Sequence, residues 1–121
     1  MSDIFDLPSN AHIHTAFGDF YSKMKDENII SNFHQLFTYA FLVGLKTENQ
    51  NTDKKTSDIM QVQNINNDNL VIIKGIALMS LEVEDGKDLL DKFMEYADGG
   101  IEKLKVDYEN DGKLSLQNYI E

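Results

Sequence analysis

The stretch LLDKFMEYADGGIEKLKVDY, residues 89–108, decides the fold of this chain. Its apolar positions step by three or four residues, which places them on one face of an α-helix. They are Leu90, Phe93, Ala97, Ile101, Leu104 and Tyr108. The register continues through Gly99 and Gly100, although each interior glycine costs a helix about 0.5–1 kcal/mol relative to alanine. Either the helix ends there and restarts, or the missing side chains let another helix come close, and the unbroken register favours close packing.

Three earlier segments also have helical patterns. Helix signals begin at about residues 10–15 and continue to Met24, and residues 31–46 predict the most buried helix, with Ser31 as its cap. In residues 68–81 an apolar run follows Asp68 or Asn69 as cap, which favours a buried helix, while its β-branched residues leave a strand open. The predicted core draws on these helices and on residues 89–108: Phe33, Phe37, Ala40, Phe41, Ile73, Ile76, Ala77, Phe93, Ala97 and Leu104.

These patterns predict a mostly α fold, a compact bundle of four to six helices in a single domain over residues 1–121. Residues 1–10 hold the only proline and are expected to form an extended arm. Residues 47–57 are polar without periodicity, which predicts an exposed, mobile loop. Residues 58–65 alternate weakly, so the fold has room for one short strand or hairpin there, and the pattern does not decide whether it forms.

Composition limits the function. The chain has no cysteine, which removes disulfides, thiolate catalysis and thiolate metal sites. Its net charge is −10 and its 11 basic residues are all lysine. Arginine makes the paired contacts that grip phosphates and guanines, so direct nucleic-acid binding is disfavoured. The acidic start does not resemble a signal peptide, and no apolar run approaches the roughly 18 residues of a membrane span. A cytoplasmic protein without membrane contact is expected.

A second stretch, DYENDGKLSLQN at residues 107–118, resembles a calcium loop. Such a loop needs a bidentate glutamate in its twelfth place, where this chain has Asn118. The amide offers one neutral acceptor oxygen, and too few residues follow for an exit helix. We therefore expect no calcium site. The sequence NDG instead predicts a turn that ends the preceding helix, after which the tail packs back on the core.

The remaining polar residues do not form a catalytic or metal-binding pattern. His12, His14 and His34 lack the i, i+4 spacing and the HExxH motif of zinc sites. The chain also has no GxSxG, no phosphate-binding glycine loop and no GxGxxG. The sequence therefore predicts no enzyme activity, no cofactor and no metal.

Two segments suggest a family. FHQLFTYAFLVGLK, residues 33–46, and YADGGIEKLK, residues 96–105, resemble the small accessory proteins encoded beside bacterial DNA-phosphorothioation (Dnd) modification and restriction genes. The segment IIKGIAL between them is also similar, so the resemblance covers about residues 17–105. It implies a bacterial, anti-phage defence setting and a non-catalytic accessory role, with no catalytic residues to transfer.

Two function classes follow. The first is an accessory subunit that binds a larger protein of the same defence locus; the second is an acidic inhibitor or immunity protein that mimics nucleic acid or antagonises a toxin or nuclease. In both, the expected contact is the acidic C-terminal third, represented by Glu95, Glu102 and Glu109. The same clustered acids also fit a solvated helix face that only keeps the protein soluble, and the sequence leaves both interpretations open. Clustered like charge speeds encounter with a basic partner. The sequence leaves a homo-oligomer open.

Overall fold

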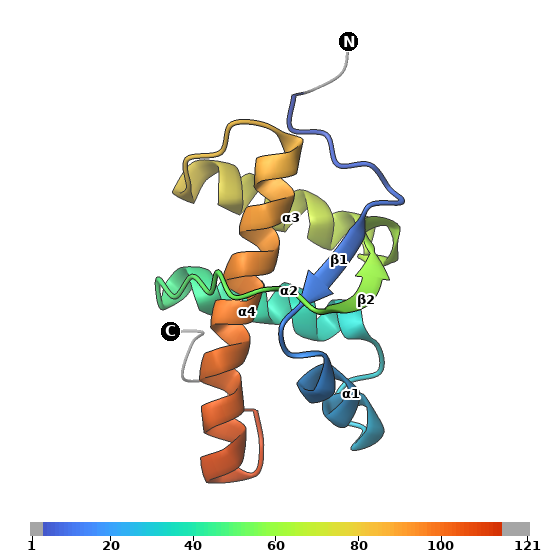
Figure 1. The fold of residues 1–121 in the computed structure, drawn as a ribbon, viewed down its shortest axis with the longest axis vertical. Helices are drawn as coiled ribbons and strands as arrows, with labels where there is room; N and C mark the ends of the chain where they lie inside the picture. The colour runs from blue at the N-terminus through green and yellow to red at the C-terminus, as the bar shows by residue number, and fades with distance from the viewer. Residues whose placement is uncertain (1–3, 115–121) are drawn as a thin grey trace.

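The structure is a computed structural model that describes residues 4–114, and helices dominate it (Figure 1). In chain order its elements are β1 (His12–Thr15), α1 (Gly18–Asp26), α2 (Phe33–Lys46), β2 (Ser57–Gln61), the short 3-10 helix η1 (Val62–Asn64), α3 (Asn67–Ser80) and α4 (Gly86–Asp111). The predicted mostly α fold is confirmed. Within residues 4–114, four α-helices and one two-stranded sheet are present.

The fold is organised by the crossing of α2 and α4. Helix α4 runs without interruption through Gly99 and Gly100, as the apolar register predicts. A Cβ atom built on Gly100 would lie 1.8 Å from the carbonyl oxygen of Ala40, and one built on Gly44 would lie 1.8 Å from the carbonyl oxygen of Tyr96. The two backbones are therefore in direct contact. The close-packing interpretation is confirmed for Gly100, whereas Gly99 packs against the loop after α2, where its Cβ would lie 1.7 Å from the carbonyl oxygen of Asn49.

Around this crossing the helices enclose an apolar core in which Phe41 and Phe93 meet edge to face, with ring centroids 5.0 Å apart. Eight of the ten predicted core residues are buried: Phe37, Ala40, Phe41, Ile73, Ala77, Phe93, Ala97 and Leu104. The prediction is wrong for Phe33 and Ile76, which are half-buried. Phe33 is the first residue of α2, at the edge of the core. Ile76 lies between the buried and exposed faces of α3.

The two strands pair antiparallel although they lie far apart in the sequence. His12 pairs with Gln61 and Thr15 with Ser57, and the register shifts between Ile13 and His14. The prediction that helix signals begin at about residues 10–15 is therefore wrong, because β1 alternates buried and less buried residues and α1 begins only at Gly18. A strand does form in residues 58–61, but it is not part of a hairpin, and η1 follows it.

Two helix starts differ from the prediction. Helix α2 is capped one residue later than Ser31, at Asn32, where the Gln35 side chain accepts a hydrogen bond from the Asn32 backbone N–H at 3.3 Å. Helix α3 is capped by Asn66, whose side-chain oxygen accepts from the backbone N–H of Asp68 at 2.9 Å. At α3 the short Asn66 side chain satisfies the first free N–H groups, as expected of a cap, but at a different residue from the one predicted. At α2 the bonds run instead from the backbone N–H groups of Ser31 and Asn32 to the Gln35 side chain.

The described part of the N-terminal arm, residues 4–11, has no regular structure but is held at both ends. Near its start, the carbonyl of Ile4 accepts from the backbone N–H of Gly86, the first residue of α4, at 2.7 Å. Near its end, the carbonyl of Ala11 accepts from the N–H of Val62 at 2.9 Å. Among the described residues, no helix is long and apolar enough to cross a membrane.

Candidate functional site

The loop that leaves α2 crosses α4 on its way to β2, as the green segment in Figure 1 shows. Six of the eleven residues 47–57 are exposed, as predicted, but four are half-buried and Asn51 is only 7% exposed. The Asn49 side chain donates to the carbonyl of Gly99 at 2.8 Å, and the backbone N–H of Asn51 donates to the carbonyl of Glu95 at 3.0 Å. Residues 49–51 of the loop are therefore bonded to α4, which the polar composition alone did not indicate.

Two of the three glutamates predicted to bind a partner also hold this loop. Glu95, Glu102 and Glu109 are seven residues apart, so they follow one side of α4. The Glu95 carboxylate accepts from the Gln50 side chain at 2.6 Å, and the Glu102 carboxylate accepts from the Asn51 side chain. Both glutamates are half-buried, whereas Glu109 is exposed. Of the three, only Glu109 is an open surface carboxylate.

A buried charge ties the loop to the strand. Asp98, 1% exposed, accepts from the Thr15 hydroxyl and from the backbone N–H of Ala16 at 2.8 Å, and its carboxylate lies 2.9 Å from the Lys55 ammonium. Each carboxylate oxygen thus has a partner, which a buried charge requires. Burial raises the pKa of the nearby Tyr21 phenol well above its usual value, and the charge of Asp98 raises it further.

Sequence reasoning did not single out Asp98. A signal was available, because Asp98 stands beside Ala97, which is part of the apolar register of residues 89–108, and directly before the two packed glycines. A carboxylate in such a place needs a cation or several donors. The partners themselves come from residues 15, 16 and 55, and nothing in the local pattern identifies them. Because each carboxylate oxygen of Asp98 already has a partner within the chain, we interpret this cluster as structural.

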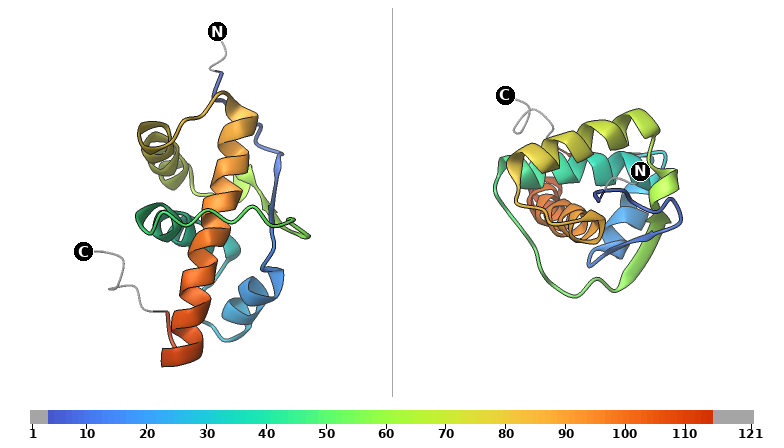
Figure 2. Two further views of the ribbon diagram at one scale, coloured as in Figure 1. Left: turned by 60° about the vertical axis from the view of Figure 1, so that its left-hand side comes forward. Right: turned by 90° about the horizontal axis from the view of Figure 1, so that it is seen from above.

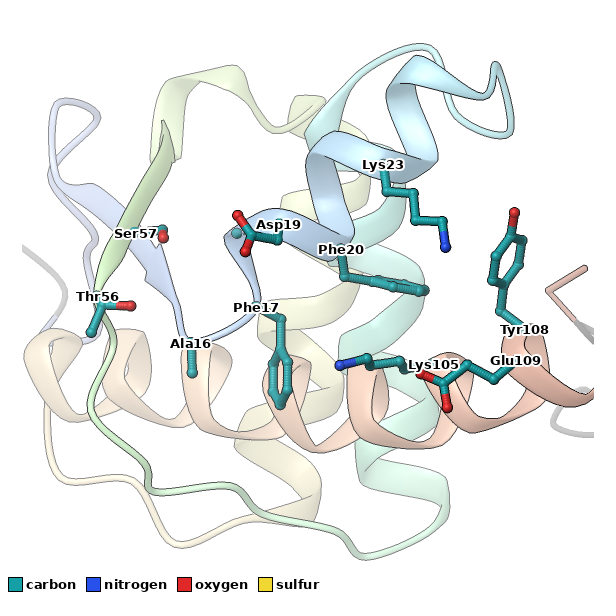
Figure 3. Close-up of a pocket in the computed structure, with 11 residues that line it drawn as sticks. Ala16, Phe17, Asp19, Phe20, Lys23, Thr56, Ser57, Lys105, Tyr108 and Glu109 are labelled. Atoms are coloured by element: carbon teal, nitrogen blue, oxygen red, sulfur yellow. The ribbon is translucent and has the colours of Figure 1, made fainter. Parts of the chain in front are cut away.

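A cavity of about 310 Å³ opens between the first turns of α1, the start of β2 and the C-terminal half of α4 (Figure 3). Lys23 extends over the ring of Tyr108, with its ammonium 5.0 Å from the ring centroid, and the Lys105 ammonium lies 6.0 Å from the ring centroid of Phe17. Glu109 lines the same cavity. Both lysines therefore make cation–π contacts within the chain, which stabilise the packing of α1 against α4.

The histidines lie in two separate regions. In the strand pair, His14 lies opposite Asp58, and His12 lies opposite Gln61. The His12 ring Nδ1 nevertheless lies 2.6 Å from a carboxylate oxygen of Asp58, and both side chains are about half exposed. His34 lies on α2. Among residues 4–114, no group of three or more histidine, aspartate or glutamate side chains could hold a metal ion.

The stretch that resembles a calcium loop begins inside α4. Residues 107–111 form the last turns of that helix, and Gly112 caps it in the left-handed conformation, with φ 71°. The predicted turn at the end of the helix is confirmed. Because helical residues advance about 100° each, Glu109 points away from Asp107 and Asp111. The predicted packing of the tail on the core concerns residues 115–121, which lie outside the described residues.

Helix α3 has an exposed apolar face. Val71 is 63% exposed, Ile72 is 55% exposed and Met79 is 89% exposed, while Ile73 and Ala77 on the other side are fully buried. The helix is apolar on both sides, which is typical of a helix covered all round. The prediction of a buried helix is therefore right for one face and wrong for the other. Seen from above, α3 is the outer layer beside α2 (Figure 2).

Comparison of the chain with protein-family models, curated proteins and solved structures finds no significant match.

Proposed function

We propose that the chain is a non-catalytic accessory protein that acts by binding a larger protein through the exposed apolar face of α3. We call this face, made of Val71, Ile72, Gly75 and Met79, the α3 face. The observation that carries the proposal is the exposure of three large apolar side chains on one short helix. Burial of each such side chain contributes roughly 1.5–3 kcal/mol, so a partner that covers the α3 face gains useful affinity from it.

The position of the α3 face supports a docking role. Helix α3 lies beside the N-terminal half of α4, and the C-terminal half of α4 extends past it toward α1 (Figure 1). The α3 face is therefore separate from the cavity of Figure 3 and from the loop of residues 47–57. A partner on α3 would not disturb the Asp98 cluster. This placement replaces the row of glutamates as the principal contact, because Glu95 and Glu102 already hold the loop.

The resemblance to accessory proteins of Dnd loci supports the biological setting. The two longer segments that carry it lie in α2 and α4, which cross at Gly44 and Gly100, and the third, IIKGIAL, lies in α3 itself. The partner is accordingly a larger protein of the same bacterial defence locus, and the complex forms in the cytoplasm. Direct nucleic-acid binding by this chain is not part of the proposal, because its net charge is −10.

The alternative function is an acidic inhibitor or immunity protein. The net charge of −10 favours it, together with exposed acids on the last turns of α4 such as Glu109 and Asp111. The two functions use different surfaces. An inhibitor would depend on α4 acids and on low salt, whereas the accessory protein depends mainly on apolar burial at the α3 face.

Co-purification tests the proposal. A tagged copy is expressed together with the products of the genes that neighbour its own, and captured in low and in high salt. One large partner should co-purify with the unchanged chain and be lost with Ile72→Glu. Val106→Glu is the matched control, because Val106 is 54% exposed on α4, away from α3, and should retain the partner. Loss with Glu109→Lys and retention with Ile72→Glu would favour the inhibitor instead.

A further inference from the structure

The α3 face has a glycine at its centre. Gly75 is exposed, and Val71, Ile72 and Met79 stand four residues before, three before and four after it, which places them around it on the same face. Glycine in the interior of a helix is unfavourable relative to alanine, chiefly because the unfolded chain has more conformations to lose. Gly75 therefore destabilises α3, unless the absence of a side chain there allows a contact that a Cβ atom would block.

Nothing among residues 4–114 packs into the space that a side chain at position 75 would occupy. A Cβ atom built on Gly75 meets no atom within 4 Å. By contrast, Cβ atoms built on Gly44, Gly99 and Gly100 would each lie under 2 Å from a backbone carbonyl oxygen, so those glycines are explained by packing. The backbone of Gly75 is ordinary helix, and Gly112 is the glycine with positive φ. Among the described helices, Gly75 is thus an interior glycine without an internal reason.

We infer that a helix of the partner protein crosses α3 at Gly75, with the two backbones in close contact. The inference rests on the proposed function and names the partner's chemistry: an amphipathic helix with apolar side chains that reach Val71 and Met79. The same chain already contains such a contact, where α2 and α4 approach through Gly44 and Gly100. By the same geometry, Gly75 is the contact point of a second helix crossing, in which α3 is one helix and the partner supplies the other.

Charge at the ends of the α3 face specifies the partner further. Asp68 is exposed at the start of α3, and Glu82 and Glu84 are exposed just after its end. The docking helix should therefore have lysine or arginine on either side of its apolar stripe, since opposite charges steer the encounter and fix the register. A second copy of this chain fits poorly, because each copy has a net charge of −10 and would bring acids against acids.

Gly75→Ala separates the two roles of this position. In the free protein the added methyl group meets open space and removes the helix penalty, so the melting temperature should rise by roughly 2–6 °C. In the complex the same methyl group stands where the partner's backbone lies, so the dissociation constant should rise about tenfold or more. A variant that is more stable alone yet binds less well cannot be explained by misfolding.

The measurement uses the neighbouring gene product that co-purifies, titrated calorimetrically with the unchanged chain, Gly75→Ala and Ile72→Glu. Weaker binding by both variants supports the inference. Binding of Gly75→Ala within twofold of the unchanged chain would overturn the helix crossing, while loss with Ile72→Glu would leave the proposed function standing. If Gly75→Ala and Ile72→Glu both bind as tightly as the unchanged chain, or if no gene product co-purifies, the helix crossing and the proposed function are both overturned. A dimer of the purified chain that Gly75→Ala dissociates would show a second copy as the occupant and overturn the hetero-partner.

Discussion

Gly100→Ala should strongly destabilise the protein because it acts at the crossing of α2 and α4. The new Cβ would lie 1.8 Å from the carbonyl oxygen of Ala40, 2.6 Å from its carbonyl carbon and 3.0 Å from its Cα. These are backbone atoms, which cannot rotate away as a flexible side chain can. The helices must separate by roughly 1 Å or more, which loosens contacts such as that between Phe41 and Phe93.

The magnitude follows from two opposing effects. Overpacking of a close-packed core costs about 1–3 kcal/mol and occasionally more, and a clash with backbone belongs at the upper end. Alanine returns about 0.5–1 kcal/mol of helix propensity. We therefore expect a net loss of about 2 kcal/mol in the free energy of unfolding, a large part of the 5–15 kcal/mol typical of a domain.

Urea unfolding followed by circular dichroism measures this loss. Gly75→Ala is the matched control, because its Cβ meets no atom within 4 Å and it should stabilise the free chain by about 0.5–1 kcal/mol. The same substitution thus has opposite signs at two helical glycines of one chain. If Gly100→Ala proved as stable as the unchanged protein, the close contact between the α2 and α4 backbones would be refuted.

Three further outcomes are expected. Phe37→Ala should lower the free energy of unfolding by about 3–5 kcal/mol, because Phe37 is 1% exposed in the core; a loss below 1 kcal/mol in a urea titration would place Phe37 at the surface. Asp98→Ala should cost about 3–5 kcal/mol, since it leaves the Lys55 ammonium without its carboxylate, and the double variant with Lys55→Met should recover part of that cost; additive losses would show that the pair is not coupled. Folding holds the pKa of Tyr21 above the unfolded value of 10.0, so the stability that depends on its neutral phenol is complete below pH 10 and is lost as the pH rises beyond it. Thermal unfolding between pH 8 and pH 11 should show a smaller loss in Tyr21→Phe, and an identical pH profile would contradict the burial of this phenol.

The sequence predicted the helices well where their apolar faces pointed to the core. The register of residues 89–108 identified α4 through its glycines, and the apolar face of α2 gave the core residues Phe37, Ala40 and Phe41. Both signals are local, since they depend on residues three or four apart in one helix. The choice of close packing over a helix break was also local, because an interrupted helix would have shifted the register.

The elements that sequence reasoning missed depend on contacts between distant residues. Strand β1 has only four residues, and its partner β2 lies more than 40 residues later, so the alternation of residues 12–15 could not be distinguished from the start of a helix. Asp98 likewise finds its partners at residues 15, 16 and 55. Composition showed that loop 47–57 is polar but could not show that its polar groups bond to α4.

The candidate site was missed for a different reason. An apolar run such as residues 70–79 predicts burial, and pattern alone does not say whether the chain itself or another molecule covers each face. The acidic residues were more conspicuous, but Glu95 and Glu102 bond to the chain's own loop. The exposure of the α3 face and the open space above Gly75 become visible only in three dimensions.

The oxidation rate of Met79 in the complex tests the central claim, docking of a partner on the α3 face, most directly. Met79 is 89% exposed, whereas Met24 is fully buried and serves as the internal control. Peroxide converts an accessible methionine to its sulfoxide, which peptide mass spectrometry quantifies. With the co-purified partner bound, oxidation of Met79 should slow about tenfold or more, since full burial reduces access, while Met24 stays protected throughout. An unchanged rate at Met79 in a fully formed complex would contradict docking on the α3 face.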